Sequence, residues 1–215
     1  MESCFEGENV QFLDIFHVSH FSIARGQVTS IIGESGAGKS TFAKLLNKMN
    51  TLTNGTIQYD GRSLEEWDAV ELRREVVMLS QSPLIVEGTI EDNLVLGCQL
   101  ADKELPTRQA MESVLQWLEV KKSLETEVTT LSGGEKQRIA LGRVALMTPQ
   151  VYILDEPTSA LDQGTEDEVM DAFIQRAKEQ GQTVCIITHS KSLAERVSDQ
   201  ILHIAEGTIT DGYHD

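Results

Sequence analysis

One eight-residue segment, Gly33 to Ser40, constrains the fold of this chain more than any other. It reads Gly-Glu-Ser-Gly-Ala-Gly-Lys-Ser, follows the apolar run Val28 to Ile32, and precedes a helical pattern over Phe42 to Met49. Glycines at this spacing let the backbone turn tightly between a strand and a helix, so that successive N–H groups converge. The sequence therefore predicts a strand, loop and helix whose loop can hold phosphate oxygens.

Two further apolar runs, Val151 to Leu154 and Val184 to Ile187, have the same continuous character. Helical patterns follow them, at Gly164 to Gln180 and at Ser190 to Val197. Continuous rather than alternating apolarity is typical of strands that are buried on both faces. Strands that alternate with helices predict an α/β fold with a mostly parallel sheet and helices on its faces.

The length of 215 residues suits a single domain, residues 1–215, and we expect three regions within it. Turn signals at Asn54-Gly55 and Asp60-Gly61 predict short antiparallel strands around the glycine-rich loop, in a mixed part that covers residues 5–80. Residues 83–150 predict helices, and residues 151–215 complete the α/β core.

Composition narrows the environment and the partners of the chain. A formal net charge of −16 repels nucleic-acid phosphates and anionic lipids, so we expect no nucleic-acid partner. No stretch approaches the roughly 20 apolar residues of a membrane-spanning helix, and the first residues lack the pattern of a secretory signal. We therefore expect a cytoplasmic location. The three cysteines, Cys4, Cys98 and Cys185, lack a metal-site spacing and are expected to be reduced thiols.

The residue types in and near the loop indicate a triphosphate and Mg²⁺. Lys39 supplies a positive charge for the β- and γ-phosphates, and the Ser40 hydroxyl can join the shell of the metal. Asp155 and Glu156 end the apolar run from Val151, where open α/β sheets bind ligands. We expect Asp155 to orient the water shell of the metal and Glu156 to polarise an attacking water as a general base.

A second glycine-containing helix start occurs at Leu131 to Arg138. Ser132 is a natural N-cap there, and Gly133 and Gly134 expose backbone N–H groups at the positive end of the helix. The chain thus has two helix starts that can bind phosphate. Either it binds two anions, or two copies hold each nucleotide between the Lys39 loop of one and Ser132 of the other.

These segments together resemble the ATP-binding cassette (ABC) ATPases, over nearly the whole chain. Six motifs stand in the order of that family, which is far more specific than any one motif alone. They are Walker A (Gly33, Glu34, Ser35, Gly36, Ala37, Gly38, Lys39, Ser40 and Thr41), the Q-loop glutamine Gln81, the signature Leu131 to Arg138, Walker B from Val151 to Glu156, the D-loop Ser159 to Asp162, and the switch histidine His189.

The resemblance implies a head-to-tail dimer that binds two ATP molecules with Mg²⁺ and hydrolyses them. Ser132, Gly133 and Gly134 of one copy would face the γ-phosphate that Lys39 of the other copy holds. Gln81 would contact Mg²⁺ and take part in catalysis, Asp162 would contact the partner's site, and His189 would position the attacking water. The partner would be a second identical copy or a paired ABC subunit, docked on an integral membrane permease at the inner face of the membrane.

The family fold would be a RecA-like core with a parallel sheet, an antiparallel β subdomain and a helical subdomain that carries the signature. Two departures stand out: the first strand of the family is expected to be shortened or absent, and no tyrosine precedes Walker A. Phe5 is our candidate for the aromatic residue that stacks on adenine.

The kind of transporter is predicted from one segment. Gln81 to Leu94 resembles exporter-type cassettes, and the chain resembles the small stand-alone ATPases associated with iron export. We therefore expect it to power export of an unidentified small solute or metal ion.

Two other function classes are weighed against transport. A soluble ABC ATPase of DNA repair or translation stays open, although the 93 residues from Lys39 to Ser132 leave no room for a long coiled coil. A kinase with a similar phosphate loop is disfavoured by the signature.

Overall fold

A computed structural model describes residues 2–211, and its centre is a six-stranded sheet in the order β10-β9-β3-β8-β7-β6. All neighbouring pairs in this sheet are parallel except β9 and β10, so the predicted parallel sheet is confirmed. The strands are β3 (Val28–Ile32), β6 (Val76–Leu79), β7 (Val151–Asp155), β8 (Thr183–Ile187), β9 (Gln200–Ala205) and β10 (Thr208–Asp211).

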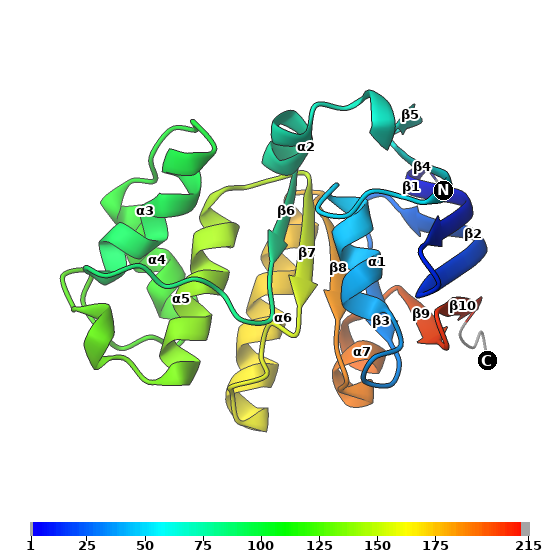
Figure 1. Cartoon of the computed structure of the whole chain (residues 1–215). Coiled ribbons are helices and arrows are strands. Elements are labelled where there is room, and N and C mark those ends of the chain that lie inside the picture. The colour runs from blue at the N-terminus through cyan, green and yellow to red at the C-terminus, as the bar shows by residue number, and fades with distance from the viewer. Residues whose placement is uncertain (1, 212–215) are drawn as a thin grey trace.

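Helices cover both faces of this sheet (Figure 1), which explains why its central strands β7 and β8 are buried along their whole length. Ile153 and Cys185 pack in one buried cluster with Phe42 of α1, whereas Tyr152 and Val184 point the other way, into the cluster that contains α6. The helices of the core are α1 (Lys39–Leu46), α2 (Ala69–Glu75), α6 (Gln163–Glu179) and α7 (Lys191–Val197).

A four-stranded antiparallel sheet in the order β2-β1-β4-β5 lies at the end of the molecule where α1 is found (Figure 1). The expectation of a shortened or absent first strand is wrong. β1 is ten residues long and pairs with both β2 and β4, because its alternating buried side chains face the core under the sheet. The strands are β1 (Ser3–Phe12), β2 (Phe16–Ala24), β4 (Asn54–Tyr59) and β5 (Arg62–Ser63).

The helical part lies at the opposite end of the molecule (Figure 1). Buried Leu94, Val114 and Leu141 come from three different helices and share one apolar cluster with the sheet. No helix of the described chain is long and apolar enough to span a bilayer. The elements are α3 (Ile90–Leu100), α4 (Arg108–Trp117) and α5 (Gly133–Leu146), with the short 3-10 helix η2 (Val128–Thr130). The other 3-10 helix, η1 (Leu64–Glu66), lies beside β4 of the antiparallel sheet.

Candidate active site

The glycine-rich loop connects the end of β3 to the start of α1 and lies tightly against the C-terminal strands. A Cβ atom at Gly33 would come within 2.0 Å of the carbonyl oxygen of Ile204 on β9, so only glycine fits there. Gly38 caps α1 with a φ of 104°, a left-handed conformation that glycine adopts without strain. The loop therefore brings its N–H groups to the N-terminus of α1, as the sequence predicts.

Lys39 is held inside this loop. Its side chain is buried, and its Nζ donates to the carbonyl oxygens of Gly33 at 2.9 Å and Glu34 at 2.8 Å. Burial lowers the pKa of the ammonium group, while the nearby carboxylates of Glu156 and Asp155 counteract that change. The ammonium group thus stands where a phosphate would meet the backbone N–H groups of the loop.

Asp155 ends β7 with its carboxylate buried in the same site. Burial raises the pKa of this carboxyl, and a hydrogen bond from Ser40 opposes the rise. One oxygen, Oδ1, has no hydrogen-bond partner among the residues that the structure describes. A buried carboxylate oxygen without a partner beside a serine hydroxyl fits Mg²⁺, which prefers oxygen ligands and keeps several waters.

Glu156 follows Asp155 and meets the histidine at the end of the neighbouring strand. Its Oε1 lies 3.1 Å from Nε2 of His189, within ion-pair distance but without the angle of a hydrogen bond. The Glu156 side chain is 12% exposed and that of His189 is 51% exposed. Burial raises the pKa of the Glu156 carboxyl, and the positive charges of His189 and Lys39 act against the rise.

One cavity of about 210 Å³ brings most of the predicted site residues together. Gly36, Lys39, Ser40, Gln81, Asp155, Glu156 and His189 all line it, although they come from four different segments of the chain. Ile15, from the turn between β1 and β2, also lines the cavity, and sequence reasoning did not select it. Ile15 and nearby Leu13 are about half exposed in the structure, and no pattern in the sequence marks either residue as part of the site.

The prediction that Phe5 stacks on adenine is wrong. Phe5 has no exposed surface, because it packs against Tyr59 with ring centroids 5.0 Å apart inside the antiparallel sheet. No base can reach it there.

The second helix start is built as its sequence predicts. Ser132 caps α5: its Oγ accepts from the Glu135 N–H at 3.2 Å, and Glu135 in turn accepts from the Ser132 N–H at 2.9 Å. Ser132 and Gly133 are exposed. Asp162 has a comparable place, since its carboxylate caps α6 by accepting from the N–H and the hydroxyl of Thr165.

Comparison with known proteins decides the family. The model of the family described as ABC transporter matches residues 16–159, a span that runs from β2 through the phosphate loop and the signature to the residues after β7. The chain belongs to the ABC transporter family. It is an ABC ATPase that binds ATP with Mg²⁺, and the family couples ATP hydrolysis to transport.

Relatives of this ABC ATPase include the glutamate transport ATP-binding protein GluA of Corynebacterium efficiens, 36% identical over 198 residues that cover 89% of this chain and 81% of GluA. Among solved structures, cbiO1 from Clostridium perfringens, part of the transporter complex cbiONQ, superposes with a TM-score of 0.85 and 25% identity over 98% of this chain and 88% of cbiO1.

A bacterial Atm1-family ABC exporter with ATP bound gives a TM-score of 0.87 and 28% identity, again over 98% of this chain. This chain spans only 39% of the length of that exporter. The predicted α/β fold of an ABC ATPase domain is therefore confirmed.

Proposed function

We propose that this ABC ATPase is one half of an ATP-dependent dimer that drives a separate membrane permease. The observation that carries the proposal is that the two phosphate-binding helix starts stand apart within one chain. Ser132, Gly133 and Gly134 are not among the residues that line the cavity around Lys39. Lys136, on the first turn of α5, is likewise absent from the lining of that cavity. A second copy, turned head to tail, would bring the two helix starts together.

Each residue of the cavity has a proposed part in hydrolysis. The loop with Lys39 binds the β- and γ-phosphates, while Ser40, Asp155 and Gln81 hold Mg²⁺, which neutralises charge on the phosphate oxygens when it is bound. Glu156 accepts a proton from the attacking water, because its largely buried carboxylate lines the cavity and burial raises its pKa. His189 holds that carboxylate and the γ-phosphate in place. Ser132 and Asp162 of the partner close the site.

Glu156→Gln tests this proposal directly. The variant keeps the shape of the side chain but cannot accept the proton, so ATP hydrolysis should fall by about 10²- to 10⁴-fold while ATP still binds. A dimer should then accumulate with MgATP, but not with MgADP, in light scattering behind a sizing column. Glu195→Gln, on the exposed face of α7, is the matched control. A variant that stays monomeric with MgATP at every protein concentration would refute the dimer.

Mixing two defective copies tests whether the active site is shared. Lys39→Ala removes the phosphate charge, and Ser132→Arg blocks the second helix start, so each homodimer should be inactive. A mixed dimer contains one site with both defects and one site with neither, and should recover part of the wild-type turnover. No recovery at any mixing ratio would contradict a site built from two chains.

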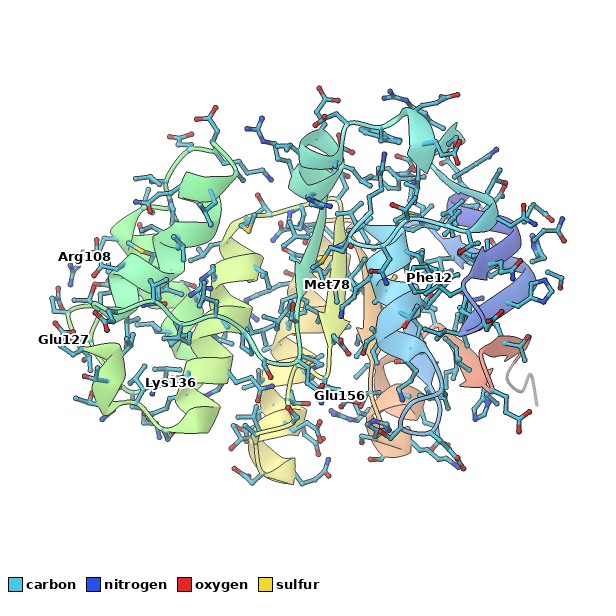
Figure 2. The ribbon with its side chains drawn as sticks, in the orientation of Figure 1. Phe12, Met78, Arg108, Glu127, Lys136 and Glu156 are labelled. Atoms are coloured by element: carbon cyan, nitrogen blue, oxygen red, sulfur yellow. The ribbon has the colours of Figure 1, made fainter. Side chains whose placement is uncertain are left out.

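An apolar groove of about 430 Å³ between the core and the helical part is the proposed permease contact. It is lined by α2, β6, α3, α5 and the segment after Gln81. Leu84 and Leu100 in its wall are 70% and 78% exposed, and Met78, labelled in Figure 2, lies on its strand β6. Arg73 and Arg74 also line it. A short helix with an apolar face and an acidic residue is the partner that fits this chemistry.

Leu100→Glu tests the groove without touching the ATP site. A carboxylate there would be buried against the partner helix, so the variant should lose its membrane partner in affinity purification while its own ATP binding stays unchanged. Leu105→Glu, which is half exposed and outside the groove, is the control. If the wild type, Leu100→Glu and Leu105→Glu all recover the same amount of membrane protein, the groove is not the permease contact.

The finer predictions of export and of a place at the inner face of the membrane rest on this permease contact. ATP-binding subunits named for phosphate import and proteins named as exporters share this fold, so the direction depends on the permease itself. We propose export, from the resemblance of the segment 81–94. Reconstitution of the purified complex in vesicles measures the direction. If no membrane protein co-purifies, a soluble ABC ATPase of DNA repair or translation becomes the better supported function.

A further inference from the structure

Gln137 is a buried polar residue of α5 whose whole side-chain amide is engaged outside its own helix. Its Nε2 donates to the carbonyl oxygen of Glu156 at 2.9 Å and to Oγ of Ser159 at 3.1 Å, and its Oε1 accepts from the N–H of Ala160 at 2.8 Å. The side chain is only 5% exposed. Both donor hydrogens are therefore used on one short segment, the turn that follows β7.

This turn carries the general base in an unusual backbone conformation. Glu156 has a φ of 50°, in the left-handed region that residues with a side chain rarely adopt. Its N–H donates to the carbonyl of Ile187 on β8 at 2.9 Å, and its own carbonyl accepts from Gln137. A conformation of this kind persists only where the surroundings fix it, and these two hydrogen bonds fix it from opposite sides.

The start of α5 touches the same turn a second time. A Cβ atom at Gly134 would lie 3.1 Å from both the carbonyl oxygen of Ala160 and the Cδ2 atom of Leu161. Helix α5 is a continuous 14-residue helix, and Gln137 lies only about one helical turn beyond the capping box of Ser132 and Glu135. A shift of the Ser132 end should therefore move the Gln137 amide, and with it the backbone of Glu156.

We propose that Gln137 is a positioning residue that couples the two ATP sites of the dimer. The inference rests on the proposed function, in which Ser132 of one chain contacts the nucleotide bound by the partner, whereas Glu156 of that chain acts on its own nucleotide. Gln137 joins these two groups within a single chain. Binding of ATP in the partner's site thus sets the backbone of the base in the other site, so that hydrolysis is cooperative.

The test compares Gln137→Met with the wild type in steady-state hydrolysis over a range of ATP concentrations. Methionine has nearly the same volume as glutamine but makes none of the three hydrogen bonds. The Hill coefficient should fall from well above one to about one, and kcat should fall by about 10-fold, within the usual range of coupling between sites. Binding of a fluorescent ATP analogue to the monomer should change by less than about 2-fold, since Gln137 does not line the ATP cavity.

Two further variants keep the test decisive. Ser159→Ala removes one of the three hydrogen-bond partners of the Gln137 amide without changing α5. It should lower the Hill coefficient by a smaller amount, even if Gln137→Met folds poorly. Gln175→Met, on the exposed face of α6, is the matched control and should leave the Hill coefficient unchanged.

The outcomes separate this inference from the proposed function. If Glu156→Gln forms no dimer with MgATP, the proposed function fails. If that variant dimerises and the double variant Glu156→Gln with Gln137→Met dimerises as well, the shared site is intact and the Hill coefficients decide. A wild type without cooperativity, or a Gln137→Met chain that keeps the wild-type Hill coefficient and kcat, would overturn the coupling by Gln137.

Discussion

His189 and Glu156 meet at 3.1 Å, Nε2 to Oε1, at the ends of two strands that are neighbours in the sheet. The register of β7 and β8 causes this meeting, because Asp155 pairs with Ile187, and each chain then leaves the sheet at the same edge. The contact joins a partly exposed imidazole to a largely buried carboxylate. It therefore places the proposed base and the residue that orients it at the mouth of the ATP cavity.

His189→Ala should lower hydrolysis far more than binding. Without the imidazole the Glu156 carboxylate loses the side chain that lies 3.1 Å from its Oε1, and the attacking water loses its support. We expect kcat to fall by about 10²-fold or more, with an ATP affinity close to that of the wild type. Steady-state kinetics and equilibrium binding on the same preparation measure the two effects. His20→Ala, on the exposed surface of β2, is the control. If ATP affinity and kcat fell by the same factor, a role of His189 in hydrolysis rather than in binding would be contradicted.

Lys39→Ala should weaken ATP binding itself. The ammonium group makes hydrogen bonds to a charged ligand, a type of interaction that contributes about 1.5–3 kcal/mol. The expected loss of affinity in titration calorimetry is therefore about 10- to 100-fold. Lys121→Ala, which changes an exposed lysine outside the cavity, should bind like the wild type. If Lys39→Ala binds ATP as tightly as the control, the loop is not the phosphate site.

Ile15→Trp should tighten nucleotide binding if the base lies over this turn. An aromatic ring stacks on a base more strongly than an aliphatic side chain, by about 1 kcal/mol, which corresponds to about 5-fold in affinity. The gain should be similar for ATP and GTP, because stacking does not read the hydrogen-bonding edge of the base. Leu105→Trp adds the same ring to an exposed site outside the cavity and should have no effect. No gain for Ile15→Trp would place the base elsewhere.

Acid should remove the stability that capping carboxylates give to the helices. Asp92 accepts from the backbone N–H and the hydroxyl of Thr89, and these hydrogen bonds lower the pKa of its carboxyl below the usual 3.8. A lowered folded-state pKa stabilises the fold above the unfolded-state value, and this stability is lost as the pH falls through the folded-state pKa. Asp92→Asn should thus lower the free energy of unfolding at about pH 6 and matter much less at about pH 3.

Urea unfolding at several pH values measures this effect. Asp14→Asn, an exposed residue in the turn after β1 that caps no helix, is the control. The capping role of Asp92 would be contradicted by a difference between wild type and Asp92→Asn that does not depend on pH.

The sequence was sufficient for those parts of the molecule where local chemistry decides the structure. The apolar runs predict β3, β7 and β8 nearly to the residue, because a strand buried on both faces lacks the polar alternation of a half-exposed strand. The glycine-rich loop and the Ser132 cap are equally local, since each depends on a few consecutive residues. The same holds for Asp155 and Glu156, whose place follows from the end of one strand.

Long-range packing decided what the sequence could not supply. Phe5 is the sequence's candidate for stacking on adenine, but pairing of β1 with β4 places it against Tyr59 and buries it. Ile15 enters the ATP cavity only because the β1–β2 turn folds over the loop, which begins 18 residues further along the chain. Gln137 reads as an ordinary polar residue of a helix, and its hydrogen bonds to the turn after β7 appear only when the two segments are packed together.

The left-handed backbone of Glu156 also bears on how this position can vary. A glycine there would adopt the same φ with less strain, so the folded chain could gain stability from such a replacement. The same replacement would remove the Glu156 carboxylate, which is the proposed base. A glycine at position 156 is therefore expected to raise thermal stability and to lower ATP hydrolysis. A screen for thermal stability alone is expected to select variants without ATPase activity.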